Sequence, residues 1–299
     1  MSARPVLRAG ALEVHLLPQS GGSVARFDRL AEGARQSLFR GTDCDNASLL
    51  EGGCFPLVPF CNRIRDGRFN CNGRIVKLAP NMPPDVSPLH GQGWLAPWQL
   101  VSSSSDQAEL RFIHPADEWP WSYDARQHFA LDPDGLSISL TCRNLSQEPM
   151  PCGLGLHPYY PCDGDTRLAT QVECAWTVDA DVLPVDLVPA SGRYDLRDRL
   201  ICGQGLDNGF GGWSGSARID WVGASASLRL STEDADFFQV YSPDSGGLFV
   251  AEPVQHANAA LNAPQDKWQE LGIHLLGQGE TRELRVRFEV ILQAASALT

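Results

Sequence analysis

The stretch LSISLTCRN, residues 136–144, alternates apolar and polar side chains without a break. Such alternation places one set of side chains on each face of an extended chain and predicts a half-buried antiparallel strand. The apolar face carries Leu136, Ile138, Leu140 and Cys142. The preceding DPDG, residues 132–135, is typical of a turn, and YDARQHFAL at 123–131 alternates as well. These two segments are therefore expected to form a β-hairpin.

The same alternation recurs from one end of the chain to the other. Near the C-terminus, Leu284, Val286, Phe288 and Val290 alternate with polar residues. Other short strand candidates are ALEVHLL (11–17), AELRFIH (108–114), ARIDWVG (217–223), ASLRLST (226–232) and FFQVYS (237–242). Gly and Pro, 28 and 21 in number, interrupt these segments, and no sustained helical periodicity is seen. The sequence predicts an all-β fold, a large antiparallel β-sandwich, with residues 1–299 forming a single domain.

Composition limits the kinds of molecule that the protein is expected to bind and the cellular compartment in which it is expected to occur. Hydrophobic residues make up 43% of the chain, enough for a sizeable core, and the formal net charge is −12. This charge argues against binding to nucleic acid or to an anionic membrane surface. Neither a signal peptide nor a membrane span is evident, so we expect a cytoplasmic protein. The nine scattered cysteines form no Cys-x-x-Cys pair and are expected to be reduced thiols.

Five segments interrupt the strand pattern with Gly, Pro, aromatic and polar residues, and they are the candidates for a functional site. They are FPLVPFCNRIRDGRF (55–69), LHGQGWLAPW (89–98), GLGLHPYY (153–160), GLDNGFGGW (205–213) and FFQVYSPDSGGLFVAEPVQHANAALN (237–262). Taken singly, Arg63, His90 and Asp207 are each compatible with ordinary surface or turn roles. Glu252 is different, because it ends an apolar strand segment and a buried carboxylate without a partner is costly.

Taken together, these segments resemble the aldose 1-epimerase (galactose mutarotase) family. The series NRIRDGRF, HGQGW, GLHPYY, LDNGF and AEPVQHANAALN stands in that family's order and at about its spacings. WPWSYDARQHFAL, residues 119–131, is similar to the family's strand pair between the second and third motifs. The resemblance runs from about residue 10 to residue 293. It implies a β-sandwich of the galactose mutarotase type that holds a hexose on its open face.

The resemblance also implies roles for individual residues. His157 would be the general acid and Glu252 the general base. The residues that would hold the sugar are Arg63, His90, Asp207 and Gln239, with Asn62 as a further candidate. Trp94, Tyr159 or Trp213 could offer an apolar face to the sugar. The partner would be a small sugar such as glucose or galactose, and the protein would be a monomer or a homodimer.

The chemistry of anomer interconversion agrees with such a pair of residues. The C1 hydroxyl must lose a proton while the ring oxygen gains one, so one base and one acid are needed. A carboxylate suits the first role, and an imidazolium with an ordinary pKa of about 6.5 suits the second. The reaction requires no metal and no cofactor, and the Gly-rich GGWSGS at 211–216 lacks the ending of a nucleotide-binding loop.

Three alternatives remain at this stage. His90, His157 and Glu252 could form a two-histidine, one-carboxylate metal site. The protein could bind a sugar without turning it over. The substrate could be a hexose 6-phosphate, for which Arg65, Arg68 and Arg126 are available cations. The role of His256 is open, and the loosely matching stretch 69–91 leaves the contacts that set substrate specificity unassigned.

Overall fold

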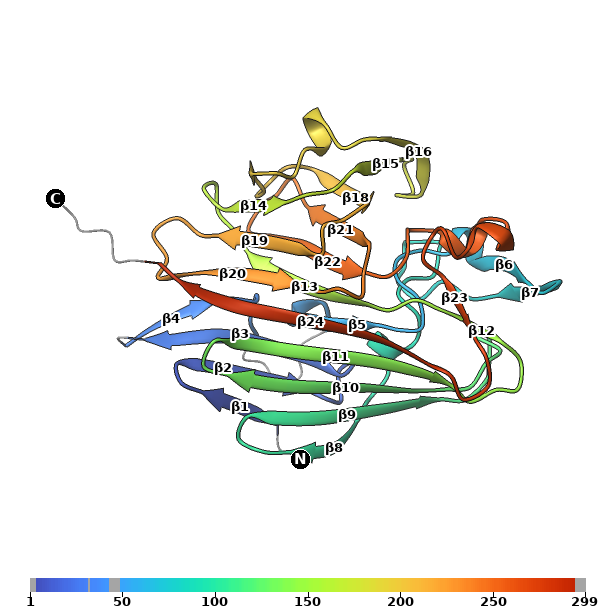
Figure 1. Cartoon of the computed structure of the whole chain (residues 1–299), viewed down its shortest axis with the longest axis horizontal. Coiled ribbons are helices and arrows are strands. Elements are labelled where there is room, and N and C mark those ends of the chain that lie inside the picture. The colour runs from blue at the N-terminus through green and yellow to red at the C-terminus, as the bar shows by residue number, and fades with distance from the viewer. Residues whose placement is uncertain (1–3, 32, 43–48, 294–299) are drawn as a thin grey trace.

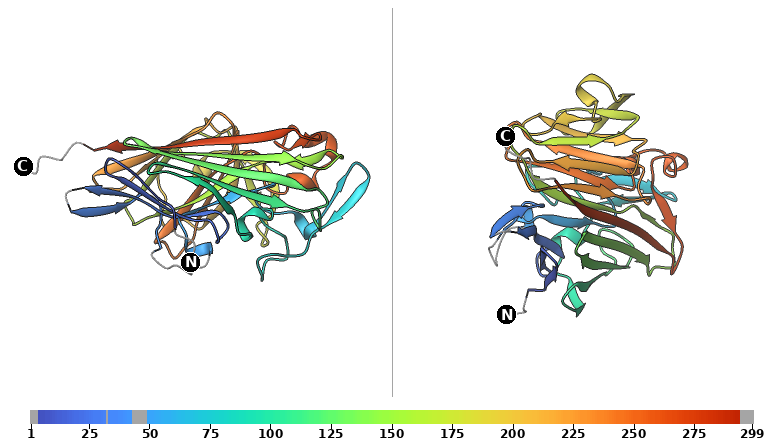
Figure 2. Two further views of the ribbon diagram at one scale, coloured as in Figure 1. Left: turned by 90° about the horizontal axis from the view of Figure 1, so that it is seen from below. Right: turned by 60° about the vertical axis from the view of Figure 1, so that its left-hand side comes forward.

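The computed structural model describes residues 4–31, 33–42 and 49–293, and this part of the chain forms two large antiparallel sheets that pack face to face (Figures 1 and 2). The predicted antiparallel β-sandwich is confirmed. Within the described residues the helical segments are short 3-10 turns, and none of them is long and apolar enough to cross a bilayer.

The first sheet has eleven strands in the order β1-β2-β3-β5-β13-β22-β21-β18-β15-β16, with β4 paired to β3. Its strands are β1 (Val6–Ala9), β2 (Leu12–Leu17), β3 (Ser23–Ala31), β4 (Ala34–Ser37), β5 (Cys54–Leu57), β13 (Gly155–Pro161), β15 (Cys174–Val178), β16 (Pro184–Pro189), β18 (Leu206–Gly211), β21 (Phe237–Ser242) and β22 (Leu248–Val254).

The second sheet has nine strands in the order β17-β14-β19-β20-β24-β11-β10-β9-β8. They are β8 (Gln99–Ser103), β9 (Gln107–His114), β10 (Tyr123–Asp132), β11 (Gly135–Asn144), β14 (Arg167–Thr170), β17 (Arg199–Leu200), β19 (Ser216–Asp220), β20 (Ala226–Ser231) and β24 (Thr281–Leu292). The predicted hairpin of residues 123–144 is confirmed as β10 and β11, which pair from Tyr123–Asn144 to Asp132–Gly135.

Smaller elements complete the described chain. Two two-stranded ribbons pair β6 (Arg68–Cys71) with β7 (Arg74–Lys77), and β12 (Met150–Cys152) with β23 (His274–Leu276). The 3-10 turns are η1 (Leu49–Glu51), η2 (Arg65–Gly67), η3 (Gly93–Leu95), η4 (Gly192–Tyr194), η5 (Ala260–Asn262) and η6 (Gln265–Lys267).

The main core lies between the two sheets. The apolar face of residues 136–144 contributes fully to it, since each of its four apolar side chains is at most 1% exposed. Aromatic rings link the two layers: Phe39, which follows β4, packs edge-on against Phe288 of β24, with ring centroids 4.9 Å apart. In such a core, truncating a large apolar side chain to alanine costs about 2–5 kcal/mol of stability.

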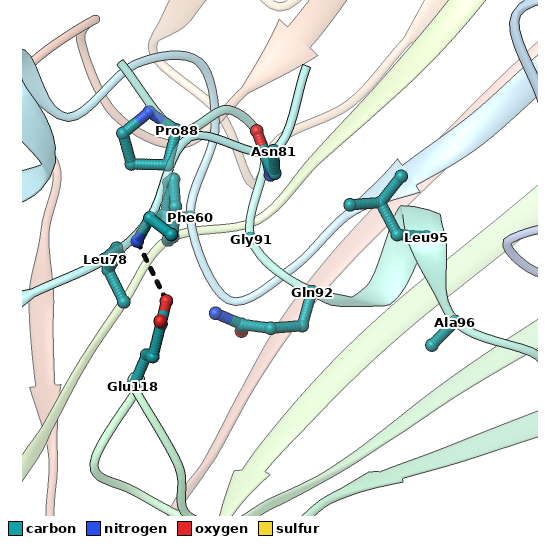
Figure 3. Close-up of a pocket in the computed structure, with 10 residues that line it drawn as sticks. Phe60, Leu78, Asn81, Pro88, Gly91, Gln92, Leu95, Ala96 and Glu118 are labelled. Atoms are coloured by element: carbon teal, nitrogen blue, oxygen red, sulfur yellow. Dashed lines mark hydrogen bonds between the residues drawn. The ribbon is translucent and has the colours of Figure 1, made fainter. Parts of the chain in front are cut away.

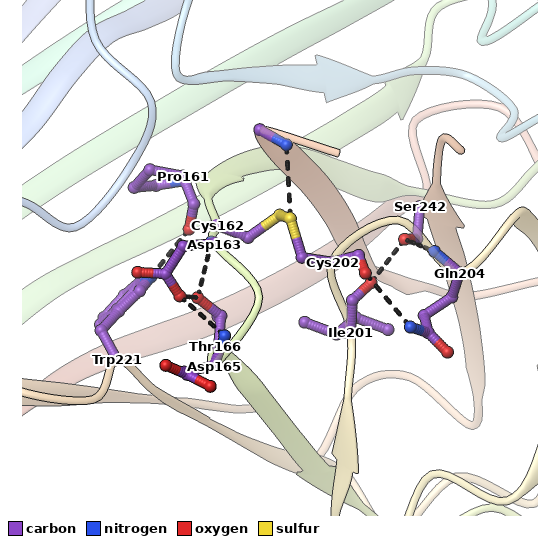
Figure 4. The surroundings of a disulfide bond; sticks show 11 residues. Pro161, Cys162, Asp163, Asp165, Thr166, Ile201, Cys202, Gln204, Trp221 and Ser242 are labelled. Carbon is purple, nitrogen blue, oxygen red and sulfur yellow. Dashed lines mark hydrogen bonds between the residues drawn. A yellow bond between two sulfur atoms is a disulfide. The ribbon is translucent and has the colours of Figure 1, made fainter. Parts of the chain in front are cut away.

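One expectation about the cysteines is wrong. The structure joins Cys162, after β13, to Cys202, before β18, in a disulfide with a Cα–Cα distance of 5.6 Å (Figure 4). The reason is topological: the end of β13 and the segment preceding β18 meet in space, which spacing along the chain does not reveal. The other described cysteines are free: Cys54, Cys61, Cys71, Cys142, Cys152 and Cys174. Cys44 lies outside the described residues.

Candidate active site

Four neighbouring strands of the first sheet present four of the predicted site residues on one face. In the strand order β13-β22-β21-β18 these are His157, Glu252, Gln239 and Asp207. The register of β13 and β22 sets His157 opposite Glu252, and Glu252 pairs directly with Gln239. Residues separated by nearly a hundred positions in the chain therefore form one row across the sheet.

Side-chain alternation explains why these residues share a face. In β22, Phe249 and Ala251 point into the core between the sheets, so Val250 and Glu252 point to the opposite side. That opposite side has its own apolar cluster, which includes Phe55, Tyr159 and Val250. Both faces of these central strands are covered, so three residues of the row are buried and Asp207 is half-buried.

His157 and Glu252 form a buried pair at the centre of the row. His157 Nε2 lies 3.4 Å from Glu252 Oε1, and the two residues are 8% and 2% exposed. The imidazole ring stacks on Phe55 at 4.3 Å and contacts Tyr159 at 4.6 Å between ring centroids. These two aromatic neighbours restrict the orientation of the ring, whose Nε2 is directed at the carboxyl group.

The surroundings of this pair disfavour charge on both members. Burial lowers the pKa of His157 to about 3, and the positive charge of Arg40 acts in the same direction. Burial raises the pKa of Glu252 well above its ordinary value; the charge of Asp207 adds to the rise, and Arg63 opposes it. Burial therefore favours the uncharged form of each residue of the pair.

Asp207 and Gln239 form a second polar pair beside the first. Gln239 Nε2 donates a hydrogen bond to Asp207 Oδ1 at 2.8 Å. Burial raises the pKa of Asp207, while Arg63 and the bond from Gln239 oppose the rise. Gly209 lies opposite Gln239 in the sheet, and a Cβ at this position would stand only 3.2 Å from Gln239 Oε1. A glycine here leaves room for the amide to reach Asp207.

Arg63 reaches the row from a loop, and its guanidinium is oriented by two oxygens. Arg63 Nε donates to Asp85 Oδ2 at 2.8 Å, and an Nη1 hydrogen bond reaches Asn62 Oδ1 at 3.2 Å. Arg63 and Asn62 were predicted from the sequence, whereas Asp85 was not. The one sequence signal for Asp85 is an acidic residue between a Pro-Pro pair and His90.

His90 is placed by a turn with unusual backbone angles. His90 has φ +61° and Gly91 has φ +73°, and a Cβ on Gly91 would lie 2.1 Å from the Val58 carbonyl oxygen. His90 Nδ1 accepts the Asn62 N–H at 3.0 Å, so the neutral ring carries its proton on Nε2. Burial lowers the pKa of His90 well below its ordinary value, as do the charges of His157 and Arg63. The ring lies 5.4 Å from that of His157.

The loop of residues 61–65 is held by side chains from residues 256–262, which we call the clasp segment. Side chains of the clasp segment accept from three loop amides: Cys61 N–H to His256 Nε2 (2.7 Å), Arg63 N–H to Asn258 Oδ1 (3.1 Å) and Arg65 N–H to Asn262 Oδ1 (2.7 Å). The intervening amides of Asn62 and Ile64 donate to His90 Nδ1 and to the Pro88 carbonyl. Every amide of this loop is thus satisfied from outside it.

This arrangement gives His256 a structural explanation that sequence left open. Its Nε2 accepts from Cys61, and its Nδ1 lies 2.7 Å from the Ala257 carbonyl oxygen, to which it donates. Burial lowers the pKa of His256 to about 4, which keeps the ring neutral and Nε2 available as an acceptor. Asn258 and Asn262 could not be predicted as functional candidates, because nothing in NAALN (258–262) indicates which backbone groups their side-chain amides contact.

The three aromatic residues that could offer an apolar face to the sugar lie in different environments. Trp94 is buried and donates to the Leu89 and Gly91 carbonyls, so it supports the His90 turn. Trp213 stacks on Phe238 at 4.6 Å within the main core. Tyr159 alone of the three adjoins His157. A further aromatic candidate is Trp176, a half-buried residue on β15 that packs against the apolar cluster on the same side of the sheet as the polar row.

A hollow of about 240 Å³ is lined by residues of the loops that include Gly91, Gln92 and Glu118 (Figure 3). Its polar groups are already engaged: Glu118 accepts the Ala79 N–H at 2.8 Å, and Gln92 accepts the Tyr123 hydroxyl at 3.2 Å. None of the seven predicted site residues lines it. This hollow is therefore separate from the predicted site residues.

Two of the alternatives were a metal site and a site for a hexose 6-phosphate. The described residues do not bring together the side chains that either alternative needs. Among the described residues, no three His, Cys, Asp or Glu side chains are arranged to hold a metal ion. Arg65 is ion-paired with Asp179 at 3.5 Å, and Arg126 lies on the second sheet, paired with Glu109 at 2.6 Å. Arg68 is an exposed residue at the start of β6.

Fold and site together define an all-β sandwich protein with a buried histidine–carboxylate pair among polar side chains on one sheet face. The family model for aldose 1-epimerase matches residues 7–289, and the chain belongs to this family.

Relatives in sequence and structure agree with this membership. The uncharacterised protein YphB of Escherichia coli K12 is 32% identical over 257 residues, 80% of this chain and 84% of YphB. A crystal structure of a candidate aldose 1-epimerase from Escherichia coli K12 superposes with a TM-score of 0.89 at 28% identity, covering 97% of this chain and 99% of the other. A galactose mutarotase-like protein of Clostridium acetobutylicum shares the fold, with a TM-score of 0.85 at 16% identity, covering 96% and 95% of the two chains.

Proposed function

We propose that the protein is an aldose 1-epimerase that interconverts the α and β anomers of a free aldohexose. The observation that carries the proposal is the buried pair of His157 and Glu252, 3.4 Å apart on adjacent strands. The donors and acceptors of Arg63, His90, Asp207 and Gln239 surround this pair, and such groups suit the hydroxyls of a sugar.

The reaction opens the ring by two proton transfers. The Glu252 carboxylate removes the proton from the C1 hydroxyl, and the His157 imidazolium protonates the ring oxygen as the C1–O5 bond breaks. The C1 hydroxyl becomes the carbonyl of an open-chain aldehyde. After rotation about C1–C2, Glu252 returns a proton to the carbonyl oxygen while His157 takes the proton of the C5 hydroxyl, and the ring closes on the other face.

The pKa shifts act differently on the two states of this proposed cycle, in each of which the pair holds one proton. With the ring closed, the proton is on His157 and the pair is an ion pair; with the aldehyde present, the proton is on Glu252 and both residues are neutral. Burial favours the neutral arrangement through the lowered pKa of His157 and the raised pKa of Glu252. The environment therefore stabilises the enzyme state that faces the open-chain intermediate.

The test is polarimetry of freshly dissolved α-D-glucose and α-D-galactose in a buffer that is a poor mutarotation catalyst. The wild-type protein should speed the approach to the same final rotation. His157→Asn and Glu252→Gln should each lower kcat/KM by about 10²–10⁴-fold, since each removes one positioned proton-transfer group. Another buried histidine, His114 on β9 of the second sheet, provides a matched control, and His114→Asn should retain wild-type activity.

Two results would overturn the proposal. One is unchanged activity in folded His157→Asn and Glu252→Gln proteins. The other is the absence of any acceleration with either hexose by the wild-type protein, which would favour a protein that binds a sugar without turning it over.

A further inference from the structure

Arg40 lies beside the polar row but has no role in the proposed proton transfers. It follows β4 and is half-buried. Its neighbour Phe39 belongs to the main core, whereas the Arg40 side chain contacts Tyr159, a member of the apolar cluster on the polar-row side of the sheet. Arg40 is therefore placed to act on the site from outside the row of predicted residues.

The backbone of Arg40 is fixed to β13 and to the segment that precedes β5. The Arg40 N–H donates to the Tyr159 carbonyl at 2.7 Å, and the Tyr159 N–H donates to the Gly53 carbonyl at 2.8 Å. A Cβ on Gly53 would lie 2.6 Å from the Arg40 carbonyl oxygen, so a glycine permits this close approach. Three segments of the chain therefore meet at Arg40 in a defined geometry.

The guanidinium of Arg40 is held by two carbonyl oxygens and one aromatic ring. Its Nη2 donates to the Gly52 carbonyl at 2.8 Å and also to the Leu50 carbonyl. Its Cζ lies 4.0 Å from the centroid of the Tyr159 ring, which is a cation–π contact. The buried Nε has no hydrogen-bond partner among the described residues. The Tyr159 ring is therefore the group of the site that Arg40 contacts.

Tyr159 connects Arg40 to the proton-transfer pair. Its ring centroid lies 4.6 Å from that of His157, so the Arg40 Cζ is within about 9 Å of the His157 ring. Burial raises the pKa of Tyr159, and Arg40 opposes that rise. The hydroxyl stays protonated at neutral pH, so Tyr159 supplies no negative charge that would compensate the charge of Arg40.

We propose that Arg40 is a positioning residue, whose guanidinium fixes the Tyr159 ring against His157 and so keeps the imidazole aligned with Glu252. This inference rests on the proposed function. Arg40 acts through Tyr159 and does not contact the sugar. Loss of its side chain should therefore lower kcat and leave KM unchanged.

The charge of Arg40 gives this role a second signature, in the pH profile. The titratable groups around His157 are Glu252 of β22, Tyr159 of β13, Cys54 of β5, His90 of the neighbouring turn and Arg40, and Arg63 and Asp207 act on Glu252. Below the acid limb of kcat/KM, both members of the pair carry a proton and no carboxylate remains as the base. The charge of Arg40 opposes this second proton, so its removal should move the acid limb to higher pH.

The experiment measures glucose mutarotation by polarimetry as a function of pH. Arg40→Gln keeps a donor for the Gly52 carbonyl but removes the charge and the cation–π contact. We expect kcat to fall by about tenfold, because the imidazole is less well aligned, with KM within about twofold of wild type. The acid limb should rise by about 0.5–1 pH unit, as Coulomb's law gives for one charge at this distance. Arg40→Lys, which keeps a cation, should retain the wild-type limb and most of kcat.

Two further substitutions separate positioning from a general loss of stability. In a Tyr159→Leu background, Arg40→Gln should change kcat little further, because the ring through which Arg40 acts is absent. Arg111→Met removes a half-buried arginine of β9 in the second sheet, where it pairs with Asp124 at 2.9 Å. Arg111→Met should leave kcat and the acid limb at their wild-type values.

The outcomes are distinct from those that test the proposed function. The inference is overturned if Arg40→Gln leaves kcat and the acid limb unchanged, if it raises KM alone, or if its effect adds in full to that of Tyr159→Leu. If the wild-type protein accelerates neither glucose nor galactose mutarotation, the proposed function fails, and NMR without sugar decides the inference alone. The nuclear Overhauser effect between the His157 and Tyr159 ring protons should weaken in Arg40→Gln and persist in Arg40→Lys. An unchanged effect in Arg40→Gln overturns the inference.

Discussion

Glu252 is a residue at which the proposed chemistry and the stability of the fold oppose each other. Its side chain is 2% exposed, and Oε2 has no hydrogen-bond partner among the described residues. In the unfolded chain its pKa is about 4.5, whereas burial raises it well above this value in the fold. As pH rises above about 4.5, the unfolded state releases this proton and the folded state does not, so stability is lost as pH rises toward the folded pKa.

Glu252→Gln should therefore gain stability at alkaline pH while losing activity. At pH 8 we expect the free energy of unfolding in urea to exceed that of wild type by about 1 kcal/mol or more, since each pKa unit corresponds to about 1.4 kcal/mol. At pH 4.5 the difference should be smaller. Urea titrations of both proteins at the two pH values measure it. A variant that is less stable than wild type at pH 8 would contradict the argument.

For individual residues, the sequence predicted which side chains form the candidate site, but it did not predict all of the residues that contact them. The seven predicted site residues converge, because the ordered series of segments carries their identity. Asp85, Trp176, Asn258 and Asn262 were missed. Two of these act on backbone groups, and Asp85 acts on another side chain, so their partners depend on how loops fold over the sheet. A single sequence contains no pattern for such contacts.

At the scale of elements, the strands were predictable and the loops were not. Alternation in residues 136–144 and 123–131 led directly to β11 and β10. The left-handed conformations of Asn62 and His90 allow the loops to turn back over the sheet, and no periodicity predicts them. The clasp segment supplies the acceptors that hold one of these loops. We therefore expect the clasp segment to control the position of Arg63.

Replacing His256 with Leu tests whether the clasp segment controls the position of Arg63. The buried Cys61 N–H would lose its acceptor, which should lower the free energy of unfolding by about 1–3 kcal/mol. Because the loop carries Arg63, the KM for glucose should rise more than kcat falls. His256→Gln, which can still present an acceptor, should restore part of the KM. Polarimetric kinetics and urea unfolding give both quantities.

The control for this variant is a buried amide outside the site. Asn144 is fully buried, and its Nδ2 donates to the Glu148 and Leu276 carbonyls at 2.9 and 2.8 Å. Asn144→Leu should cost similar stability without changing KM. Equal effects of the two substitutions on KM would assign His256 a role in stability alone.

At the scale of the whole molecule, the sequence predicted the architecture but not the strand order. The site depends on β5, β13, β22, β21 and β18 being neighbours, although they come from distant parts of the chain. Edge-to-edge pairing depends on the complementarity of whole strands and on the loops between them, which local alternation does not encode. The disulfide between Cys162 and Cys202 was missed for the same reason, because it joins segments that only the assembled sheet brings together.

Net charge is the whole-molecule property that bears on the choice between a free and a phosphorylated sugar. The chain carries a formal net charge of −12. Arg65 is paired with Asp179, and Arg126 is paired with Glu109 on the second sheet. A phosphorylated sugar would therefore meet a repulsive field without a cluster of available cations at the site.

We accordingly expect glucose 6-phosphate to be a poorer substrate than glucose, with kcat/KM lower by about tenfold or more at low ionic strength. Raising NaCl from about 0.01 M to about 0.5 M shortens the screening length from roughly 30 Å to below 8 Å. This should increase the kcat/KM for glucose 6-phosphate and leave that for glucose unchanged, because only the anion experiences the field. Polarimetry of both sugars across the salt series measures the effect. A phosphorylated sugar that is preferred, with a rate that falls as salt is added, would instead indicate a cationic phosphate site.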